Sequence, residues 1–358
     1  MREGWEYKKF ENCIVKSPKL KQVKKEAYNN GSQYPIISQE EKFISGYCDD
    51  ESMVCHIDRP IVVFGDHTRV LKYIDFDFVV GADGVKVIIP IKSIDSKFLL
   101  YFLQWYNIPN LGYSRHYKLL KDVMVPIPNC TTQQTIISEL DKLNELIQIK
   151  KEQLKAYDAL AQSIFYEMFG DPVENEKGWE VKKLGEVSIY PKERVAINQI
   201  CSSQYVGVEN LIKDRGGVCF SDNLPKADVA IAYKENDILL GNIRPYLKKI
   251  WLADKVGGAS GDVVIIRIKE RSISPLFLFK LLSSDQFFEY DNTHTKGAKM
   301  PRGDRKAIEK FGVILPPLSL QQSFAQKIEQ IEQQKVAIQK TITDLETLLA
   351  ARMQYWFD

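Results

Sequence analysis

Residues 136–168 read IISELDKLNELIQIKKEQLKAYDALAQSIFYEM, and this stretch decides the architecture of the chain. Apolar residues return after four and then three positions, from Ile136 through Leu140 and Leu143 onward. This alternation, sustained over more than four heptads, is typical of a helix that packs along one side against another helix. At about 1.5 Å per residue, the predicted helix is roughly 50 Å long.

The same seam returns in residues 324–356, which read FAQKIEQIEQQKVAIQKTITDLETLLAARMQYW. A helix packed only onto its own domain is the simpler alternative. The length of the seam and its recurrence favour instead two helices that pair antiparallel, with a globular unit at each end. Lys150, Lys335 and Arg352 are the polar residues on the two seams. The predicted helix–helix seam consists of Ile136, Leu140, Leu143, Ile147, Leu154, Tyr157, Ile164, Phe324, Ile328, Ile331, Ile338, Ile342, Leu345 and Leu349.

Each helix ends one copy of a longer internal repeat. Residues 4–10 (GWEYKKF) recur as 178–184 (GWEVKKL), and residues 125–128 (VPIP) recur as 314–317 (ILPP). Gln133-Gln134 likewise recurs as Gln321-Gln322. The order is kept while the offset drifts from 174 to 189 residues. One unit was therefore duplicated and then altered by loop insertions.

The segments before each long helix predict globular domains. Short β-branched runs such as residues 61–64 and 263–268 are bounded by Gly, Asp and Pro, which favours strands and turns. The predicted fold class is mixed α/β (α+β): two globular domains, each followed by a long helix, with the helices paired as an antiparallel coiled coil in a pseudo-two-fold repeat. The expected boundaries are 1–130 and 171–318 for the domains, and 131–170 and 319–358 for the helices.

Composition limits the kinds of partner. The chain has 358 residues, 44% hydrophobic and 27% charged, which excludes a disordered or collagen-like protein. A formal net charge of +2 excludes a polycationic binder, so any affinity for nucleic acid must come from local patches. Residues 1–130 and 178–318 carry +2 and +5, whereas 131–177 and 319–358 carry −4 and −1. We expect a polyanion to meet the globular domains and protein partners to meet the helices.

Targeting and metal signals are missing from the sequence. The N-terminal residues lack the apolar stretch of a secretory signal, and apolar runs fall short of the ~18 residues of a membrane span. The six cysteines form no CxxC pair, and the spacing of Cys48 from Cys55 and His56 is not a common zinc spacing. We expect a reduced, cytoplasmic protein with no metal site.

Catalytic motifs are also missing. No Gly-rich loop precedes a Lys-Ser or Lys-Thr pair, which excludes a P-loop NTPase. Residues 257–261 (GGASG) stand before a strand, so they fit a dinucleotide or S-adenosylmethionine loop poorly. Residues 242–246 (NIRPY) lack the paired prolines of the Asn-Pro-Pro-Tyr motif of amino-methyltransferases. We therefore assign no catalytic residue.

Two loops in each copy concentrate basic and aromatic residues at corresponding places. Arginine can bind guanine edges, lysine and backbone amides can bind phosphates, and aromatic rings can pack on sugars or bases. One such loop alone is more simply a solvated charged loop, but four at equivalent places favour a surface that reads DNA. The predicted DNA-binding residues are His67, Arg69, Tyr113, Ser114, Arg115, His116, Tyr117 and Lys118 in the first copy, and Arg244, Tyr246, Lys248, Lys249, Lys296, Lys299, Arg302, Arg305 and Lys306 in the second.

The order of these motifs resembles the specificity subunits of type I restriction-modification enzymes over essentially the whole chain. Residues 66–69 (DHTR) followed by 81–86 (GADGVK) resemble one variant of the family's recognition domain. The loop at 112–118 departs from the sequence of residues 297–301 (GAKMP). The main motifs are residues 296–317 followed by Gln321-Gln322 and the long helix, residues 169–172 (FGDP), residues 178–184, and residues 244–249 (RPYLKK).

The resemblance implies two target recognition domains, each reading one half of a bipartite site on double-stranded DNA. It implies that the helices set the gap between the half-sites and dock two methyltransferase (modification) subunits. Catalysis would lie on the partners: adenine-N6 methylation with S-adenosylmethionine on the methyltransferase, and cleavage with ATP and Mg on the endonuclease (restriction) subunits. This chain itself would bind no cofactor.

Two other interpretations stay open. A specificity module of a fused restriction-methylation enzyme would share the recognition domains but serve a different partner. A coiled-coil scaffold without a DNA role would tolerate neutralisation of the basic loops. An enzymatic role is the least favoured, because the sequence contains no catalytic constellation.

Overall fold

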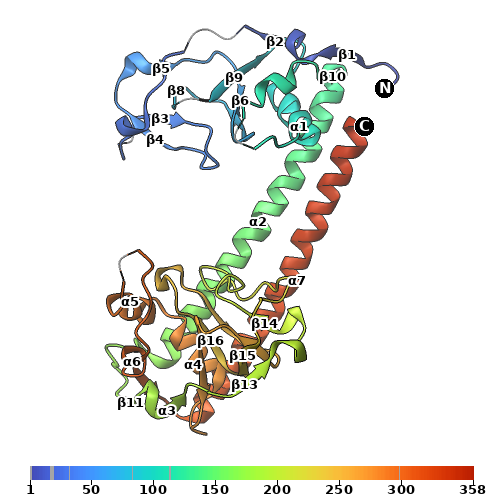
Figure 1. The fold of residues 1–358 in the computed structure, drawn as a ribbon. Coiled ribbons are helices and arrows are strands. Elements are labelled where there is room, and N and C mark those ends of the chain that lie inside the picture. The colour runs from blue at the N-terminus through green and yellow to red at the C-terminus, as the bar shows by residue number, and fades with distance from the viewer. Residues whose placement is uncertain (1, 17–19, 32, 83, 113, 298) are drawn as a thin grey trace. The chain divides into compact units, whose positions relative to one another are not determined.

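The structure, a computed structural model, describes residues 2–16, 20–31, 33–82, 84–112, 114–297 and 299–358. The chain divides into two compact units: unit 1 is Met1–Gln153 with Ile338–Asp358, and unit 2 is Leu154–Ala337. Two long helices, α2 (Cys130–Phe169) and α7 (Leu318–Phe357), each begin in one unit and end in the other (Figure 1). No helix of the described residues is long and apolar enough to cross a membrane.

Unit 1 is built from small sheets and a covering helix. α1 (Ser96–Tyr106) packs on β6 and β7. The Asp95 carboxylate caps the first turn of α1 by accepting from the backbone N–H groups of Lys97 and Phe98. The strands pair as β1 (Glu6–Lys9) with β10 (Met124–Ile127); as β2 (Ile14–Val15), β9 (Val85–Pro90), β6 (Ile61–Gly65) and β7 (Leu71–Ile74); and as β4 (Gly46–Cys48), β3 (Tyr34–Ile37), β8 (Phe78–Val80) and β5 (Val54–Cys55).

Unit 2 repeats this plan. Its strands pair as β11 (Glu180–Lys183) with β20 (Gly312–Leu315); as β12 (Ser188–Ile189), β19 (Val263–Ile268), β16 (Ile238–Gly241) and β17 (Ile250–Leu252); and as β13 (Arg194–Ala196), β15 (Val229–Tyr233), β18 (Gly257–Ala259) and β14 (Tyr205–Val206). Its helices are α3 (Leu184–Val187), α4 (Pro275–Leu282), α5 (Asp285–Thr293) and α6 (Arg305–Ile308). Among the described residues, unit 1 has no helix that corresponds to α5.

The repeated glutamines confirm the internal repeat at the level of single hydrogen bonds. The buried Gln133 side chain accepts from the Asp95 N–H at 2.8 Å and donates to the carbonyls of Ser93 and Pro128. The buried Gln321 side chain accepts from the Ser274 N–H at 2.8 Å and donates to the carbonyls of Ser272 and Pro316. In each unit, one glutamine therefore ties the start of a long helix to the start of the short helix that covers the sheet.

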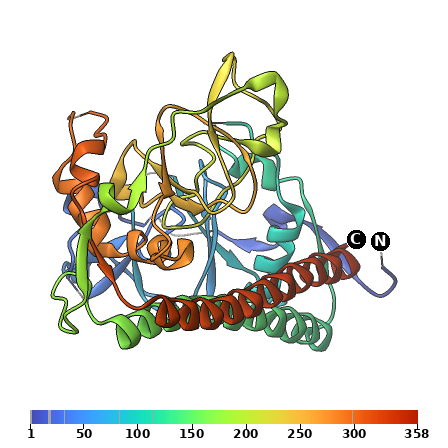
Figure 2. The ribbon, with the colours of Figure 1, turned by 90° about the horizontal axis from the view of Figure 1, so that it is seen from below.

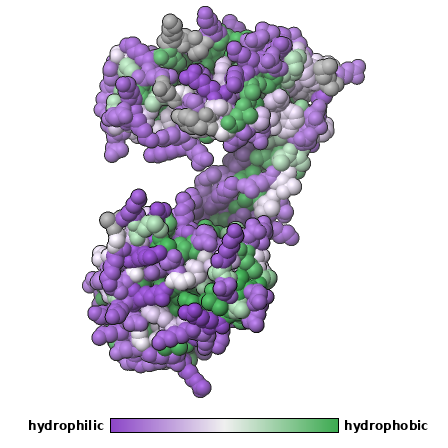
Figure 3. Space-filling model, in the orientation of Figure 1, coloured by the Kyte–Doolittle hydropathy of each residue, from purple (hydrophilic) through white to green (hydrophobic). Residues whose placement is uncertain are grey.

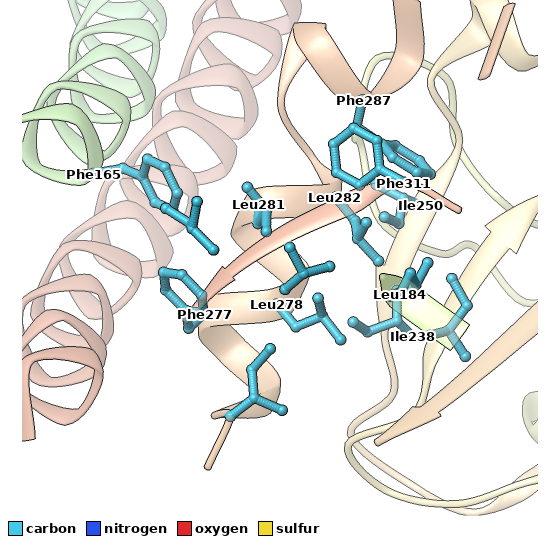
Figure 4. Close-up of a cluster of buried hydrophobic side chains, with 14 of the residues drawn as sticks. Phe165, Leu184, Ile238, Ile250, Phe277, Leu278, Leu281, Leu282, Phe287 and Phe311 are labelled. Carbon is cyan, nitrogen blue, oxygen red and sulfur yellow. The ribbon is translucent and has the colours of Figure 1, made fainter. Parts of the chain in front are cut away.

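Each unit has an apolar core in which a long helix ends. In unit 2, the Phe277 ring of α4 lies 5.8 Å from the Phe165 ring of α2 (Figure 4). It lies 4.8 Å from the Phe169 ring, also on α2. In unit 1, the Phe357 ring of α7 lies 5.6 Å from the Phe98 ring of α1. These aromatic contacts fix the last turn of each long helix. Hydrophilic residues cover most of the visible surface of both units (Figure 3).

The long helices run antiparallel in both units, as predicted. In unit 1, Arg352 of α7 forms an ion pair with Glu139 of α2, and Lys151 lies 2.8 Å from Glu346. In unit 2, Lys335 lies 2.7 Å from Asp158, and the Phe324 ring lies 5.7 Å from the Phe165 ring. Within each unit, higher numbers on α2 thus meet lower numbers on α7, and the paired segments lie side by side in Figures 1 and 2.

The predicted seam residues lie on the inner faces of these segments. Lys150, on the seam in unit 1, is half-buried and donates to Gln153 at 3.0 Å. In unit 1, Ile136, Leu140, Leu143, Ile147 and Ile342 are buried, and Ile338, Leu345 and Leu349 are half-buried. In unit 2, Phe324, Ile328 and Ile331 are buried, and Leu154, Tyr157 and Ile164 are half-buried.

Candidate nucleic-acid interface

In unit 1, backbone hydrogen bonds join the two predicted loops. Strand β6 ends at Gly65, opposite Val85 of β9. At the next residue, the Asp66 N–H donates to the Gly84 carbonyl at 2.6 Å, and the Asp66 carbonyl accepts from the His116 N–H at 2.8 Å. The end of a central strand is thereby tied to the segment that contains residues 114–118. We call this contact junction 1.

His116 and Tyr117 lie inside junction 1. The fully buried His116 ring bonds to the Asp66 carbonyl through Nδ1 at 2.9 Å and accepts from the Leu111 N–H through Nε2 at 3.0 Å. The Tyr117 ring packs against Phe10 and Phe64, both with centroids 6.1 Å away, and burial raises the pKa of its hydroxyl. The expectation that the His116 side chain contacts DNA needs correction, because its ring is fully buried and holds the loop. Tyr117 is half-buried, and its contact with DNA stays a prediction.

The remaining predicted residues of unit 1 surround this core. The Arg69 guanidinium donates to the Ile108 carbonyl at 2.9 Å, and the ring nitrogen Nδ1 of His67 lies 3.2 Å from the Ser114 carbonyl. Arg115 and Lys118 are exposed. Tyr113 lies outside the described residues. Arg69 and His67 therefore shape the loops, while Arg115 and Lys118 supply outward positive charge.

Unit 2 forms the equivalent contact with the same backbone bonds, and we call it junction 2. Strand β16 ends at Gly241, opposite Val263 of β19. The Asn242 N–H donates to the Asp262 carbonyl at 3.0 Å, and the Asn242 carbonyl accepts from the Gly303 N–H at 3.1 Å. Asn242 thus takes the place of Asp66, and Gly303 takes the place of His116.

Junction 2 extends into a short paired segment. Lys296 and Arg302 exchange two backbone hydrogen bonds of 2.8 and 2.9 Å. The Arg244 N–H donates to the Pro301 carbonyl at 2.8 Å. Arg244 has a left-handed φ of 53°, so its backbone is held in a conformation that a non-glycine residue adopts only when its surroundings fix it. The position of Arg244 therefore depends on the segment that carries Pro301.

Internal contacts engage most of the predicted cations of unit 2. Lys248 lies 2.5 Å from Asp285, and Arg215 pairs with the same carboxylate. These two partners hold the pKa of Asp285 below its ordinary value. Two further cations form ion pairs: Lys296 with Asp304, and Arg302 with Asp262. Two others donate to backbone carbonyls: Lys249 to Val208, and Arg305 to Gly261.

Three predicted cations of unit 2 point to solvent without a partner. Arg244, Lys299 and Lys306 are exposed, and within the described residues their side chains form no hydrogen bond or ion pair. The Tyr246 ring is 53% exposed. An unpaired cation keeps its full charge for a phosphate or a base edge. The outward chemistry of junction 2 therefore lies on these four residues.

Buried polar atoms without partners mark both junctions independently. In the described part of the chain, the buried side-chain nitrogen and oxygen atoms that lack a hydrogen bond are Ser114 Oγ, Asn242 Oδ1 and both carboxylate oxygens of Asp291. Buried polar groups are rarely left unpaired, and those that are often belong to functional regions. Asp66 and Asn242 begin two of the predicted loops but are not among the predicted contact residues, although each follows a glycine at the end of an equivalent strand. The sequence does not single out Asp291 at all.

The described residues hold no group of three His, Cys, Asp or Glu side chains able to bind a metal ion. The six cysteines are free thiols. Each junction consists of loops anchored by backbone hydrogen bonds and bordered by outward cations, and junction 2 adds the exposed Tyr246 ring. Such an arrangement can bind a polyanion and present side chains to base edges.

Comparisons with known proteins point in the same direction. A family model described as the type I restriction modification DNA specificity domain matches residues 2–156. The chain is 25% identical over 304 residues to the type I restriction enzyme MjaIX specificity subunit of Methanocaldococcus jannaschii. The aligned region covers 74% of this chain and 69% of that protein. It is 27% identical over 107 residues to the EcoDI specificity subunit of Escherichia coli, covering 30% of this chain and 23% of that one.

Solved structures share the fold. The S subunit of a type I restriction-modification system from M. genitalium aligns with a TM-score of 0.58 and 13% identity, covering 99% of this chain and 96% of that chain. A chain from a study of complex assembly and conformational transition of the type I R-M system aligns with a TM-score of 0.56 and 13% identity, covering 99% and 98%. At this identity, the likeness establishes the architecture of two domains and long helices.

Proposed function

We propose that this chain, which belongs to the specificity subunits of type I restriction-modification systems, reads a bipartite DNA site with one loop junction in each unit. The observation that carries the proposal is the junction itself, which is built twice with the same backbone bonds and is bordered by exposed cations in both copies. Two copies of one DNA-binding loop junction in a single chain match a DNA site that consists of two short half-sites. Tethering also raises the effective concentration of the second unit once the first has bound.

In this proposal, some outward cations contact base edges and others contact phosphates. Arg244 can form a bidentate contact with a guanine edge, and Lys299 and Lys306 can hold phosphates. Arg115 and Lys118 do the same for unit 1. The tied loops hold the backbone that carries these side chains before DNA arrives, which lowers the entropy lost on binding.

The helices would dock the methyltransferase subunits. In unit 1, a groove of about 740 Å³ lies between α2 and α7, with Leu143 and Leu348 among its lining residues. In unit 2, Leu160 and Val336 are large apolar side chains exposed on the same two helices. A methyltransferase subunit could cover these side chains and the groove on the same two helices. Methyl transfer with S-adenosylmethionine, and cleavage with ATP and Mg on the endonuclease subunits, would then belong to the partners and not to this chain.

The direct test is a map of methylated adenines in cells with and without this gene, with the partner subunits present in both. We expect loss of one motif that has two short defined halves around a fixed undefined spacer. An unchanged map, in cells where a pull-down recovers the methyltransferase with this chain, would contradict the proposal. The motif itself would reveal the recognised sequence.

A second experiment tests the role of the helices as a spacer. One heptad inserted into both α2 and α7, so that their seams stay matched, adds roughly 10 Å, or about three base pairs of DNA. We expect the methylated motif to keep both halves and to gain a longer spacer. Insertion into α2 alone serves as the control and should abolish methylation, because the seams then fall out of register.

A further inference from the structure

Asp291, Asn242 and Gly303 meet at junction 2, where buried side-chain oxygens lack hydrogen-bond partners among the described residues. Asp291 of α5 is 1% exposed and Asn242 is 9% exposed, and neither the Asp291 carboxylate nor Asn242 Oδ1 has a hydrogen-bond partner. Gly303 lies between them. A Cβ atom placed on Gly303 would stand 2.5 Å from Asp291 Oδ1 and 3.0 Å from Asn242 Oδ1. Both oxygens therefore crowd the same point.

Two acceptor oxygens cannot bond to each other unless a proton lies between them. An ionised carboxylate only accepts, whereas a carboxylic acid has one O–H that can donate to an amide oxygen. Burial raises the pKa of Asp291 from its ordinary value to about 6, with His294 opposing the shift. A hydrogen bond donated by the protonated form favours that form further. One proton would thus pair one Asp291 oxygen with Asn242 Oδ1.

We infer that Asp291 is a positioning residue for DNA recognition in unit 2: its protonated carboxyl donates a hydrogen bond to Asn242 Oδ1 and holds the two loops of junction 2 together. The inference rests on the proposed function of these loops. Gly303 N–H bonds to the Asn242 carbonyl, and Arg244 N–H bonds to the Pro301 carbonyl. A displacement at Asn242 therefore moves Arg244, which the proposal places on the DNA.

Protonation links this contact to pH. Because the folded-state pKa of Asp291 lies above its ordinary value of 3.8, the folded chain binds this proton more tightly than the unfolded chain. The stabilisation is complete at low pH and is lost as pH rises through about 6. Phosphates of bound DNA favour the neutral carboxyl, so DNA affinity should fall over the same range. The titratable groups that interact with Asp291 are His294, just after α5, and Tyr190, just after β12.

The test compares Asp291→Asn with Asp291→Ala in the full chain. Asparagine donates a hydrogen bond at every pH. We expect Asp291→Asn to raise the Tm above that of the wild type at pH 8, and to give a DNA affinity, measured with the methyltransferase partner, that varies less between pH 5.5 and 8. Asp291→Ala removes the contact and should lower affinity by about tenfold, the effect of one lost hydrogen bond. His294→Gln removes the imidazole, so a pH dependence that persists in this variant is due to the Asp291 carboxyl.

Asp237→Asn is a matched control for the direction of the Tm change at pH 8. Asp237 is another buried aspartate of unit 2, but it lies 2.7 Å from Arg267. Asp237→Asn should lower the Tm at pH 8, because it breaks an ion pair. If Asp291→Asn also lowers the Tm and the affinity at pH 8, Asp291 is an ionised acceptor and the inference is wrong. If the wild-type complex binds no DNA, the proposed function fails, while the Tm comparison still decides the state of Asp291.

Discussion

The two loop junctions share a backbone and differ in the side chains that fill it. In junction 1, the buried His116 ring occupies the space behind the loop and satisfies both of its nitrogens. In junction 2, Gly303 stands at that place and leaves room for the Asp291 carboxyl, which comes from a helix without a counterpart in the described residues of unit 1. The backbone bonds of Asp66 and Asn242 are the same. A recognition domain can therefore change its interior and loop sequences while the loops stay anchored to the same strand end.

The comparison also separates cations that build the site from cations that face outward. Arg69 in unit 1 bonds to a backbone carbonyl, whereas Arg244 in unit 2 has no side-chain partner among the described residues. Both arginines have a left-handed φ, 63° and 53°. The two arginines occupy similar places in the repeated sequence. Arg69 nevertheless supports its loop, whereas the Arg244 side chain is available to a ligand.

The largest effect is expected from His116→Ala. The substitution opens a cavity in place of a fully buried ring and removes both hydrogen bonds of that ring, so unit 1 should lose about 3 kcal/mol of unfolding free energy. Urea unfolding of the full chain, followed by hydrogen exchange in each unit, measures the loss and its location. His294→Ala, at an exposed ring of unit 2, is the control and should cost far less. Equal losses for both variants would remove the assigned role of His116.

Gly303→Ala tests the crowding in junction 2. The added methyl would meet Asp291 Oδ1 at 2.5 Å, so the carboxyl or the loop must move, at a cost of about 1–3 kcal/mol. Thermal unfolding measures this cost. Gly261→Ala is the matched control in the same unit, because its added Cβ meets nothing within 4 Å. An unchanged Tm for Gly303→Ala would show that the junction is looser than its contacts indicate.

Arg244→Ala and Arg69→Ala should have opposite profiles. Arg244→Ala should leave the Tm unchanged and weaken DNA binding by about 1–3 kcal/mol, with relaxed preference at one base pair. Arg69→Ala should lower the stability of unit 1, because it removes the hydrogen bond to Ile108. Binding to a panel of single-base site variants, with the assembled complex, distinguishes the two. An Arg244 variant that binds every site as the wild type does would place this loop outside the interface.

The smallest effect is expected from Lys299→Ala. A lysine that contacts a phosphate adds about 0.9 to the slope of log affinity against log salt concentration, without regard to sequence. Lys296→Ala is the comparison, since Asp304 lies 2.6 Å from that ammonium group and already offsets its charge. We expect the slope to fall more for Lys299 than for Lys296. Titrations at several salt concentrations give both slopes, and the reverse order would contradict the assignment.

The sequence by itself determined the features that depend on local period and order. The heptad seams predicted two long antiparallel helices, and residues such as Leu140 and Ile328 are buried there. The repeated motifs predicted two copies of one domain, confirmed by the matching bonds of Gln133 and Gln321. A period of alternating four and three is a property of neighbouring residues, so it can be seen without knowing the fold.

Only the tertiary structure decided which loop residues face inward. His116 has the composition of a nucleic-acid contact, but the carbonyl of Asp66, just after β6, holds its ring in the interior. Asp291 carries no sequence signal, because its role depends on Asn242 and Gly303, which are distant in the chain and adjacent in space. The direction of a polar side chain is set by the partners that the fold brings to it, and those partners are not its neighbours in sequence.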